Sequence, residues 1–281
     1  MQANTKHFFQ LNAFQLKLMA LITMTIDHFG AYQTFTINQA INDGLRIIGR
    51  AAAPLFLFLV TEGLRHTHDK AKYILRLYTA GVIIEIINRI IEKNTETPGL
   101  GNTLPMFFYT ALFAFCTEQM IHHRDQIKTV CTAACGLLLP FLFYILHVLL
   151  LENGFSTEWY LISIFFPSPL HVDYSILFVL LGTAWYFIDN RIINCAIFAF
   201  LSLICKIVPV SVFFSTALPM WFRPVYFDVF SLFIDTQWCM CFAVPFMLLY
   251  NGEKGRGLKY LFYIYYPLHV YILFFIQYLR N

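Results

Sequence analysis

The chain has 281 residues, of which 59% are hydrophobic and only 12% are charged. A soluble domain carries about 25% charged residues, because it must cover its surface with groups that water solvates. This chain has about half that fraction of charged residues, which excludes an ordinary water-soluble enzyme. Much of its surface is therefore expected to face lipid. The net charge of +3 is too small and too dispersed to indicate a nucleic-acid-binding protein.

Long apolar runs follow one another along the whole chain. A helix needs about 20 mainly apolar residues to cross the hydrocarbon core of a bilayer. The fold class we predict is all-α, a polytopic integral membrane protein with about nine transmembrane helices (about 8–10) and a single domain over 1–281. In chain order the expected spans are 16–36, 45–64, 73–91, 104–121, 128–151, 172–188, 191–211, 225–250 and 258–279.

Two connecting segments contain prolines within apolar sequence, 159–170 and 207–224. Either could be re-entrant, which requires protein or a water-filled cavity to satisfy its backbone. Lysine and arginine gather in alternate connections, as in 65–76 and 254–259. By the positive-inside rule these connections face the cytoplasm, so the N-terminus is expected there too.

Asp27 and His28 lie inside the first expected span. An ionisable group there costs at least ~2.5 kcal/mol, so each is a functional candidate. The two point to different faces of a helix, whereas Lys17 shares the face of His28 at a distance of about 16 Å. A cation at the cytoplasmic mouth and an imidazole at depth suit a ligand such as acyl-coenzyme A. Alternatively, Lys17 only snorkels and His28 forms a structural hydrogen bond. Asp27 could orient a histidine or balance an arginine.

Arg46 and Arg50 stand four residues apart in the second span and therefore on one helix face. Two guanidiniums this close repel, so each needs an anion. Asp27, Asp43 and Glu85 are internal candidates, and a phosphate or thioester oxygen is the external one. The pair is thus either a ligand clamp or a structural ion pair. Pro54 follows and permits a kink, because it removes a helical hydrogen bond.

Glu62 and Arg65 end the second span, before a loop rich in histidine and lysine. We interpret this loop as cytoplasmic and solvated, with cations that could hold the phosphates of a nucleotide head group. His66, His68 and Asp69 have no matching ligand cluster elsewhere, so no metal site is predicted.

The last span contains Tyr265 and His269 one turn apart, with Pro267 between them. Proline frees backbone groups that a cavity or a neighbour must satisfy. With Glu62 these two residues form a possible second site. Glu85 and Arg89 on the third span are expected to make a structural ion pair, because they are four residues apart.

Three stretches, 16–30, 45–65 and 259–269, resemble the TraX family of conjugative pilin acetylation proteins, and 101–103 matches more weakly. TraX proteins in turn resemble the acyltransferase-3 membrane proteins, which carry an arginine, ten residues and a histidine on their first helix. Lys17 and His28 stand at that spacing, with lysine in place of arginine.

The resemblance implies an acyltransferase-3-like bundle in the bacterial inner (cytoplasmic) membrane. It implies an N-acetyltransferase that moves an acetyl group from cytoplasmic acetyl-CoA to the N-terminal amine of pilin. On this interpretation His28 is the catalytic base, with Asp27 acting beside it. The residues expected to bind acetyl-CoA are Lys17, Arg46, Arg50 and Arg65.

Two alternatives stay open from the sequence. One is an O-acyltransferase that modifies a cell-envelope glycan or lipid. The other is a transporter or proton-coupled channel in which Asp27, His28, Arg46, Glu85 and His269 relay charge. The absence of an inverted repeat argues against the transporter.

Overall fold

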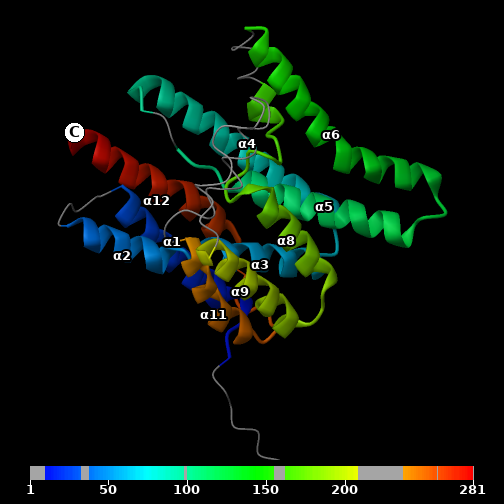
Figure 1. The fold of residues 1–281 in the computed structure, drawn as a ribbon, viewed down its shortest axis with the longest axis horizontal. Coiled ribbons are helices and arrows are strands. Elements are labelled where there is room, and N and C mark those ends of the chain that lie inside the picture. The colour runs from blue at the N-terminus through cyan, green and yellow to red at the C-terminus, as the bar shows by residue number, and fades with distance from the viewer. Residues whose placement is uncertain are drawn as a thin grey trace, which may run out of the picture. The chain divides into compact units, whose positions relative to one another are not determined.

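The computed structural model describes residues 10–32, 38–97, 100–154, 162–207, 237–257 and 259–280. These residues are helical or irregular, apart from one isolated bridge between Leu11 and Tyr250, so the predicted all-α class is confirmed (Figure 1). The elements are α1 (Ala13–Ala31), α2 (Gln39–Gly49), α3 (Ala52–Arg65), α4 (Lys70–Thr95), α5 (Leu104–His122), α6 (Ile127–Glu152), α8 (Ser175–Phe187), α9 (Arg191–Ile207), η3 (Gln237–Ala243), α11 (Val244–Leu248) and α12 (Lys259–Arg280).

Several helices are apolar enough to indicate a membrane protein. Four stretches in the described part of the chain are long and apolar enough to cross a bilayer: Gln39–Arg65, Leu104–His122, Ile127–Leu150 and Phe262–Arg280. Shorter apolar helices cover Ser175–Phe187, Arg191–Ile204 and Gln237–Leu248. Helix occurs within each of the predicted spans, but the count of nine crossings and the cytoplasmic N-terminus stay predictions.

The second predicted span, 45–64, is divided into two helices. α2 ends at Gly49 and α3 begins at Ala52, with a turn at Arg50 and Ala51. Pro54 explains the position of this break, because it has no N–H to donate to the Arg50 carbonyl four residues earlier. The kink expected near Pro54 is therefore confirmed, and it lies directly at Arg50.

The contacts divide the chain into two compact units, and the boundary passes through α3. Among the described residues, those within 1–59, 190–207 and 237–280 form the first unit, and those within 60–189 form the second.

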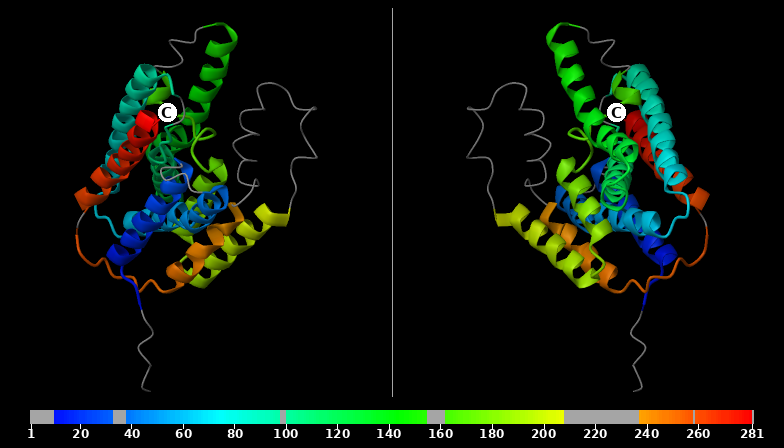
Figure 2. Two further views of the ribbon diagram at one scale, coloured as in Figure 1. Left: turned by 90° about the vertical axis from the view of Figure 1, so that its left-hand side faces the viewer. Right: turned by 90° about the vertical axis from the view of Figure 1, so that its right-hand side faces the viewer.

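In the first unit, α1 packs against both α2 and α12, and α9 packs against η3 and α11. Both views of Figure 2 show α9 beside η3 and α11. The start of α1 is held by a capping box, in which the Asn12 and Gln15 side chains each accept from the backbone N–H of the other. Leu11 exchanges backbone hydrogen bonds with Leu249 and Asn251. The entry into α1 is therefore fixed at both sides.

In the second unit, α5 is the central helix and contacts α4, α6 and α8. Figure 1 shows α5 and α6 as a connected pair. A Cβ atom at Gly136 of α6 would lie 2.7 Å from the Cys116 sulfur of α5. Glycine thus permits the close approach that packing between membrane helices favours. Met106, Phe178 and Trp185 are almost completely buried in this unit.

The proline-containing segment 159–170 is described from residue 162 onward. Its backbone is satisfied by protein, since Tyr78 donates to the Phe165 carbonyl at 2.8 Å and Tyr109 donates to the Pro167 carbonyl. Such partners are what irregular backbone at membrane depth requires. The other segment, 207–224, lies outside the described residues after Ile207.

Candidate functional site

The first helix presents its two ionisable residues to two different neighbours. Asp27 faces α2 and His28 faces α12, because successive side chains on a helix diverge by about 100°. The predicted divergence of the two faces is therefore confirmed. A polar site forms where α1 lies against these two helices within the first unit.

Two polar contacts join α1 to α12 about one turn apart. The Thr25 hydroxyl lies 2.8 Å from the Tyr265 hydroxyl, and His28 Nδ1 lies 2.7 Å from His269 Nε2. The two imidazole rings meet edge to edge through these nitrogens, with their centroids 4.9 Å apart and an interplanar angle of 24°. His269 is buried, with 7% of its surface exposed. The last span thus contributes to the same site as the first.

The hydrogen bonds determine where two neutral imidazoles carry their hydrogens. His269 Nδ1 lies 2.8 Å from the Tyr265 carbonyl, which can only accept, so this nitrogen carries the hydrogen. His269 Nε2 is then the acceptor, and His28 Nδ1 donates to it. The remaining nitrogen, His28 Nε2, holds an unprotonated lone pair.

Tyr265 is itself held in place from α1. The single hydrogen of the Thr25 hydroxyl is directed to the Leu21 carbonyl at 2.8 Å, so the Tyr265 hydroxyl donates to Thr25. The Tyr265 ring also stacks on His269 with centroids 5.1 Å apart. Tyr265 therefore supports His269 with both its ring and its carbonyl.

Lys17 and His28 both face α12, as their shared helix face predicts. The Lys17 ammonium lies 5.5 Å from the centroid of the Phe262 ring, within cation–π distance. Going up the chain, Lys17, Thr25 and His28 of α1 contact α12 in turn. Their partners are Phe262, Tyr265 and His269, which follow the same order, so α1 and α12 run parallel.

Asp27 stands between the two arginines of the second span. Its carboxylate lies 3.6 Å from the Arg46 guanidinium and 3.5 Å from that of Arg50. Both distances exceed the 2.7–2.9 Å that is typical of charge-assisted hydrogen bonds. Arg50 is 6% exposed, and its guanidinium also donates a long hydrogen bond of 3.4 Å to Gln237. One carboxylate and two guanidiniums leave one net positive charge.

Two glycines make this arrangement possible. A Cβ atom at Gly49 would lie 2.6 Å from Asp27 Cα, and one at Gly30 would lie 2.7 Å from the Asn42 carbonyl oxygen. The backbones of α1 and α2 can approach this closely only because neither glycine has a side chain. The sequence analysis missed both residues, although their places directly after His28-Phe29 and before Arg50 were a usable signal. Gln237 had no such signal, because it lies far away in the chain.

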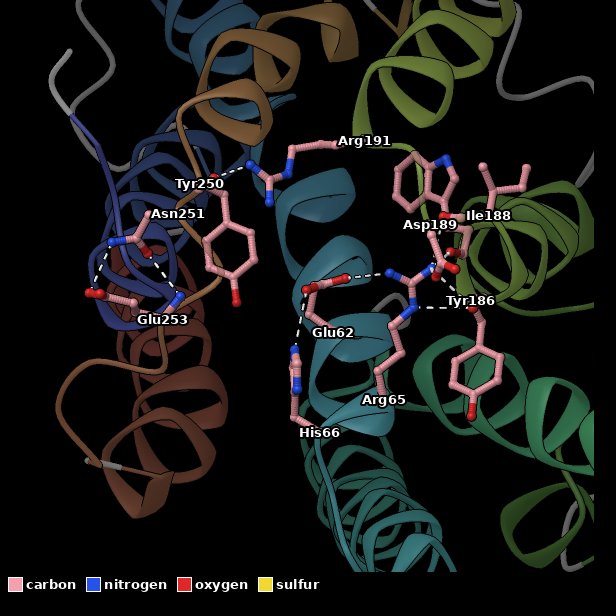
Figure 3. Close-up of polar contacts among 11 residues, drawn as sticks. Glu62, Arg65, His66, Tyr186, Ile188, Asp189, Arg191, Tyr250, Asn251 and Glu253 are labelled. Atoms are coloured by element: carbon pink, nitrogen blue, oxygen red, sulfur yellow. Dashed lines mark hydrogen bonds and ion pairs between the residues drawn. The ribbon is translucent and has the colours of Figure 1, made fainter. Parts of the chain in front are cut away.

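Glu62 and Arg65 belong to the second unit, where Arg65 ties α3 to the end of α8. Figure 3 shows Arg65 between Glu62 and the residues that end α8. Its guanidinium donates to Glu62 at 3.0 Å, and to the carbonyls of Trp185, Tyr186 and Ile188 at 2.5–3.1 Å. The last carbonyls of a helix lack intrahelical partners, so Arg65 acts as a C-terminal cap. The role of Arg65 in binding acetyl-CoA stays a prediction.

An analogous contact of the first unit is visible in Figure 3. Arg191, at the start of α9, donates to the Tyr250 carbonyl and stacks over the Tyr250 ring at 5.1 Å. The ion pair expected between Glu85 and Arg89 is confirmed at 2.7 Å. Arg191 and Arg89 thus each bond to groups of their own unit.

An open cleft of about 520 Å³ lies where α4 begins in the second unit. Beside it, the Lys70 ammonium donates to Glu118 at 2.6 Å and to the Tyr186 hydroxyl at 2.6 Å. Burial lowers the pKa of Lys70, but the bonds to Glu118 and Tyr186 outweigh it and hold that pKa above its ordinary value. No group of three or more potential metal ligands occurs among the described residues. The cleft is lined by His68, Asp69, Lys70, Ala71, Phe115, Glu118, Gln119, His122 and His123.

Two proteins with related sequences were found. Probable fimbrial assembly protein FimC, serogroup H1, of Dichelobacter nodosus is 38% identical over 74 residues, which are 26% of this chain and 30% of that protein. Uncharacterized protein RP591 of Rickettsia prowazekii (strain Madrid E) is 27% identical over 207 residues, 73% of this chain and 66% of that protein. The chain thus covers less than two thirds of the length of either relative. No solved structure matches.

The family described as "TraX protein" matches residues 13–277, which is nearly the whole chain. The matched region includes α1, α2, α3 and the part of α12 that carries Tyr265 and His269. Both the residues of the candidate site and the helices that hold them therefore lie within the matched region, and the chain belongs to the TraX family.

Proposed function

We propose that this chain is a membrane-bound acetyltransferase that moves an acetyl group from cytoplasmic acetyl-CoA to the N-terminal amine of a pilin subunit. Membership of the TraX family supports this proposal, as does similarity to a probable fimbrial assembly protein. The acceptor rests on that relative and on the resemblance described above, and the chemistry rests on the site of the first unit.

The observation that carries the proposal is the hydrogen bond between His28 Nδ1 and His269 Nε2, which leaves His28 Nε2 with a lone pair when both rings are neutral. His28 Nδ1 is occupied by His269, so Nε2 is the nitrogen that can take a proton. A histidine suits general base catalysis because its unperturbed pKa, about 6.5, lies near the working pH. An amine nucleophile requires such a base, since it must lose a proton once it has attacked a carbonyl.

The proposed reaction is a direct acyl transfer. The acceptor amine attacks the thioester carbonyl of acetyl-CoA, forming the C–N bond, and His28 Nε2 takes the proton of the amine. The C–S bond then breaks, and the CoA thiolate receives that proton from the His28 imidazolium. The products are the N-acetylated acceptor and free CoA, so atoms and charges balance.

Arg46 and Arg50 supply the positive charge that this reaction needs. The negative charge that develops on the thioester oxygen is stabilised by preorganised cations nearby. Among the described residues, Asp27 balances only one of the two guanidiniums, which leaves a net positive charge for the oxyanion or for a CoA phosphate. Lys17 would meet the anionic head of the donor nearer the start of α1.

The test is acetyl transfer by the full chain, purified in nanodiscs. Labelled acetyl-CoA is offered with a pilin N-terminal peptide, and a second peptide with a blocked α-amine serves as control. His28→Ala is expected to reduce transfer by about 10²–10⁴-fold, the usual contribution of a positioned base. His123→Ala, in an exposed turn, is the matched control and is expected to retain full activity.

Each outcome decides a different part of the proposal. Label on the α-amine that depends on His28 would support donor, acceptor and base together. Release of CoA that depends on His28 without labelled peptide would remove pilin as acceptor and favour a glycan or lipid. No binding or turnover of acetyl-CoA would overturn the acetyltransferase and favour the transporter.

A further inference from the structure

His269 makes three contacts that all act on the orientation of His28. It accepts from His28 Nδ1, donates to the Tyr265 carbonyl at 2.8 Å, and stacks on the Tyr265 ring. Nothing in these contacts requires His269 to touch a substrate. Its chemistry is directed entirely toward the residue proposed as base.

The direction of the hydrogen-bond chain has a consequence for His28. Because the Tyr265 carbonyl can only accept, the chain runs from His28 through His269 to Tyr265, with each imidazole donating from Nδ1. Which nitrogen of a histidine is protonated is determined by the hydrogen bond that the other nitrogen makes. His28 is therefore held with hydrogen on Nδ1, whereas an unrestrained histidine favours hydrogen on Nε2.

The supporting elements make this restraint rigid. His269 is 7% exposed, so its ring has little freedom to turn. Tyr265, one turn earlier on α12, is fixed to Thr25 of α1 by its hydroxyl. Thr25 and His28 lie three residues apart on α1, so Tyr265 and His269 are both hydrogen-bonded to the same helix. These two hydrogen bonds hold α1 against α12 and also fix the orientation of the His28 and His269 rings.

We propose that His269 is a positioning residue, which holds His28 in the Nδ1–H tautomer and so keeps a lone pair on Nε2 for the acceptor. This inference rests on the proposed function for the use of that lone pair, but the tautomer itself is independent of any reaction. Without an acceptor at position 269, the His28 ring could turn and carry its hydrogen on Nε2. That nitrogen would then have no lone pair with which to accept a proton from the acceptor amine.

The direct test is the tautomer of His28, measured by ¹⁵N magnetic resonance on the full chain in nanodiscs with labelled histidine. The wild type is expected to show hydrogen on His28 Nδ1, and His123 in an exposed turn serves as the unrestrained reference in the same spectrum. In His269→Phe, which keeps a ring but has no acceptor, the hydrogen is expected to move to Nε2. In His269→Gln, the amide oxygen can still accept, so the Nδ1–H form is expected to persist.

The kinetic test uses the same two variants in the acetyl-transfer assay. His269→Phe is expected to lower kcat by about 10²-fold or more, the scale of lost base catalysis, with the KM for acetyl-CoA unchanged. His269→Gln is expected to recover most of that loss. A purely structural histidine would give equal losses in both variants and no change of tautomer.

The outcomes separate this inference from the proposed function. A wild-type His28 with hydrogen on Nε2, or on both nitrogens, would overturn the inference even if neither variant folds. A tautomer that stays on Nδ1 in a folded His269→Phe variant would also overturn it. The expected tautomers with no acetyl transfer in the wild type would sustain the positioning role and refute the acetyltransferase.

Discussion

Charge around Arg65 in the second unit is arranged differently from charge around Asp27 in the first. In the second unit, all three nitrogens of the Arg65 guanidinium donate to protein groups, and Lys70 reaches Glu118 at 2.6 Å. In the first unit, Asp27 stays 3.5 and 3.6 Å from its two arginines. Every guanidinium nitrogen of Arg65 therefore has a hydrogen-bond partner. Around Asp27, by contrast, Asp27 Oδ1 and Arg50 Nε have no hydrogen-bond partner among the described residues.

The difference fits a structural role for Arg65 and the proposed functional role for the site around Asp27. A buried charge is costly unless it is paired and hydrogen-bonded, so saturation is the expected state of a structural group. In the part of the chain that the structure describes, the site around Asp27 and His28 departs from that state in two ways, through an excess of positive charge and through a lone pair on His28. Both are properties that an anionic acyl donor and a nucleophile could use.

The largest effect that would break this comparison is expected from Asp27→Leu. Removing the carboxylate leaves two guanidiniums close together, one of them 6% exposed. The expected loss is about 3–5 kcal/mol of unfolding free energy, the usual cost of breaking a buried ion pair from one side. Thermal unfolding in detergent, followed by circular dichroism, measures it. The double variant Asp27→Leu, Arg50→Leu is expected to recover part of the loss, and an unchanged single variant would show that the pairs contribute nothing.

Gly49→Ala tests whether the close helix crossing creates the site. The added Cβ would lie 2.6 Å from Asp27 Cα, so one helix must move. We expect a loss of about 1–3 kcal/mol, as for other overpacked contacts, together with weaker acetyl transfer. Gly44→Ala on the same helix is the matched control, because its Cβ meets nothing within 4 Å. That change is expected to stabilise the helix by about 0.5–1 kcal/mol, and equal behaviour of the two variants would contradict the crossing.

Arg65→Lys tests whether the fully hydrogen-bonded arginine of the second unit stabilises the fold. Lysine keeps the charge but cannot bond several carbonyls in one plane. The expected loss is about 2 kcal/mol of stability. An Arg65 that acts only as a cap at the end of α8 would leave the KM for acetyl-CoA unchanged. Steady-state kinetics at a temperature where the variant is folded decides the matter. A tenfold rise in that KM would instead place Arg65 at the donor head group.

The smallest effect is a pH dependence at Lys70. Because its pKa is raised in the folded state, its bonds stabilise fully below the unfolded value of about 10.4 and lose their contribution as pH rises through the folded value. Lys70→Met is expected to cost about 1 kcal/mol at pH 8, with the difference from wild type shrinking at higher pH. Unfolding midpoints measured across pH 8–11 test this expectation. A difference that is constant with pH would show that packing, and not charge, accounts for it.

Several features of the site could be predicted from the sequence by helix geometry. The divergence of Asp27 from His28 and the shared face of Lys17 and His28 are confirmed by the contacts. The need of Arg46 and Arg50 for an anion was also predicted, with Asp27, Asp43 and Glu85 as candidates, and the structure places Asp27 there. These follow from residue spacing on one helix or from the need of a buried charge for a counterion. Such rules hold whatever the tertiary structure is.

The partners across helices could not be predicted, since spacing along the chain says nothing about which faces meet. The sequence analysis placed His269 and Tyr265 in a possible second site with Glu62. The structure joins the two α12 residues to His28 and Thr25, whereas Glu62 pairs with Arg65 in the other unit. Nor could the sequence reveal that Gly30 and Gly49 permit the crossing, because a glycine's role depends on what approaches it.

By itself, then, the sequence determined the membrane class, the all-helical architecture and the ionisable residues of the spans. The bilayer excludes water, so apolar length and rare charges are visible in one dimension. Only the tertiary structure decided which of those charges are saturated and which nitrogen of His28 keeps its lone pair. Those properties depend on distances of about 3 Å between residues far apart in the chain, and hydrogen bonds form or fail at that scale.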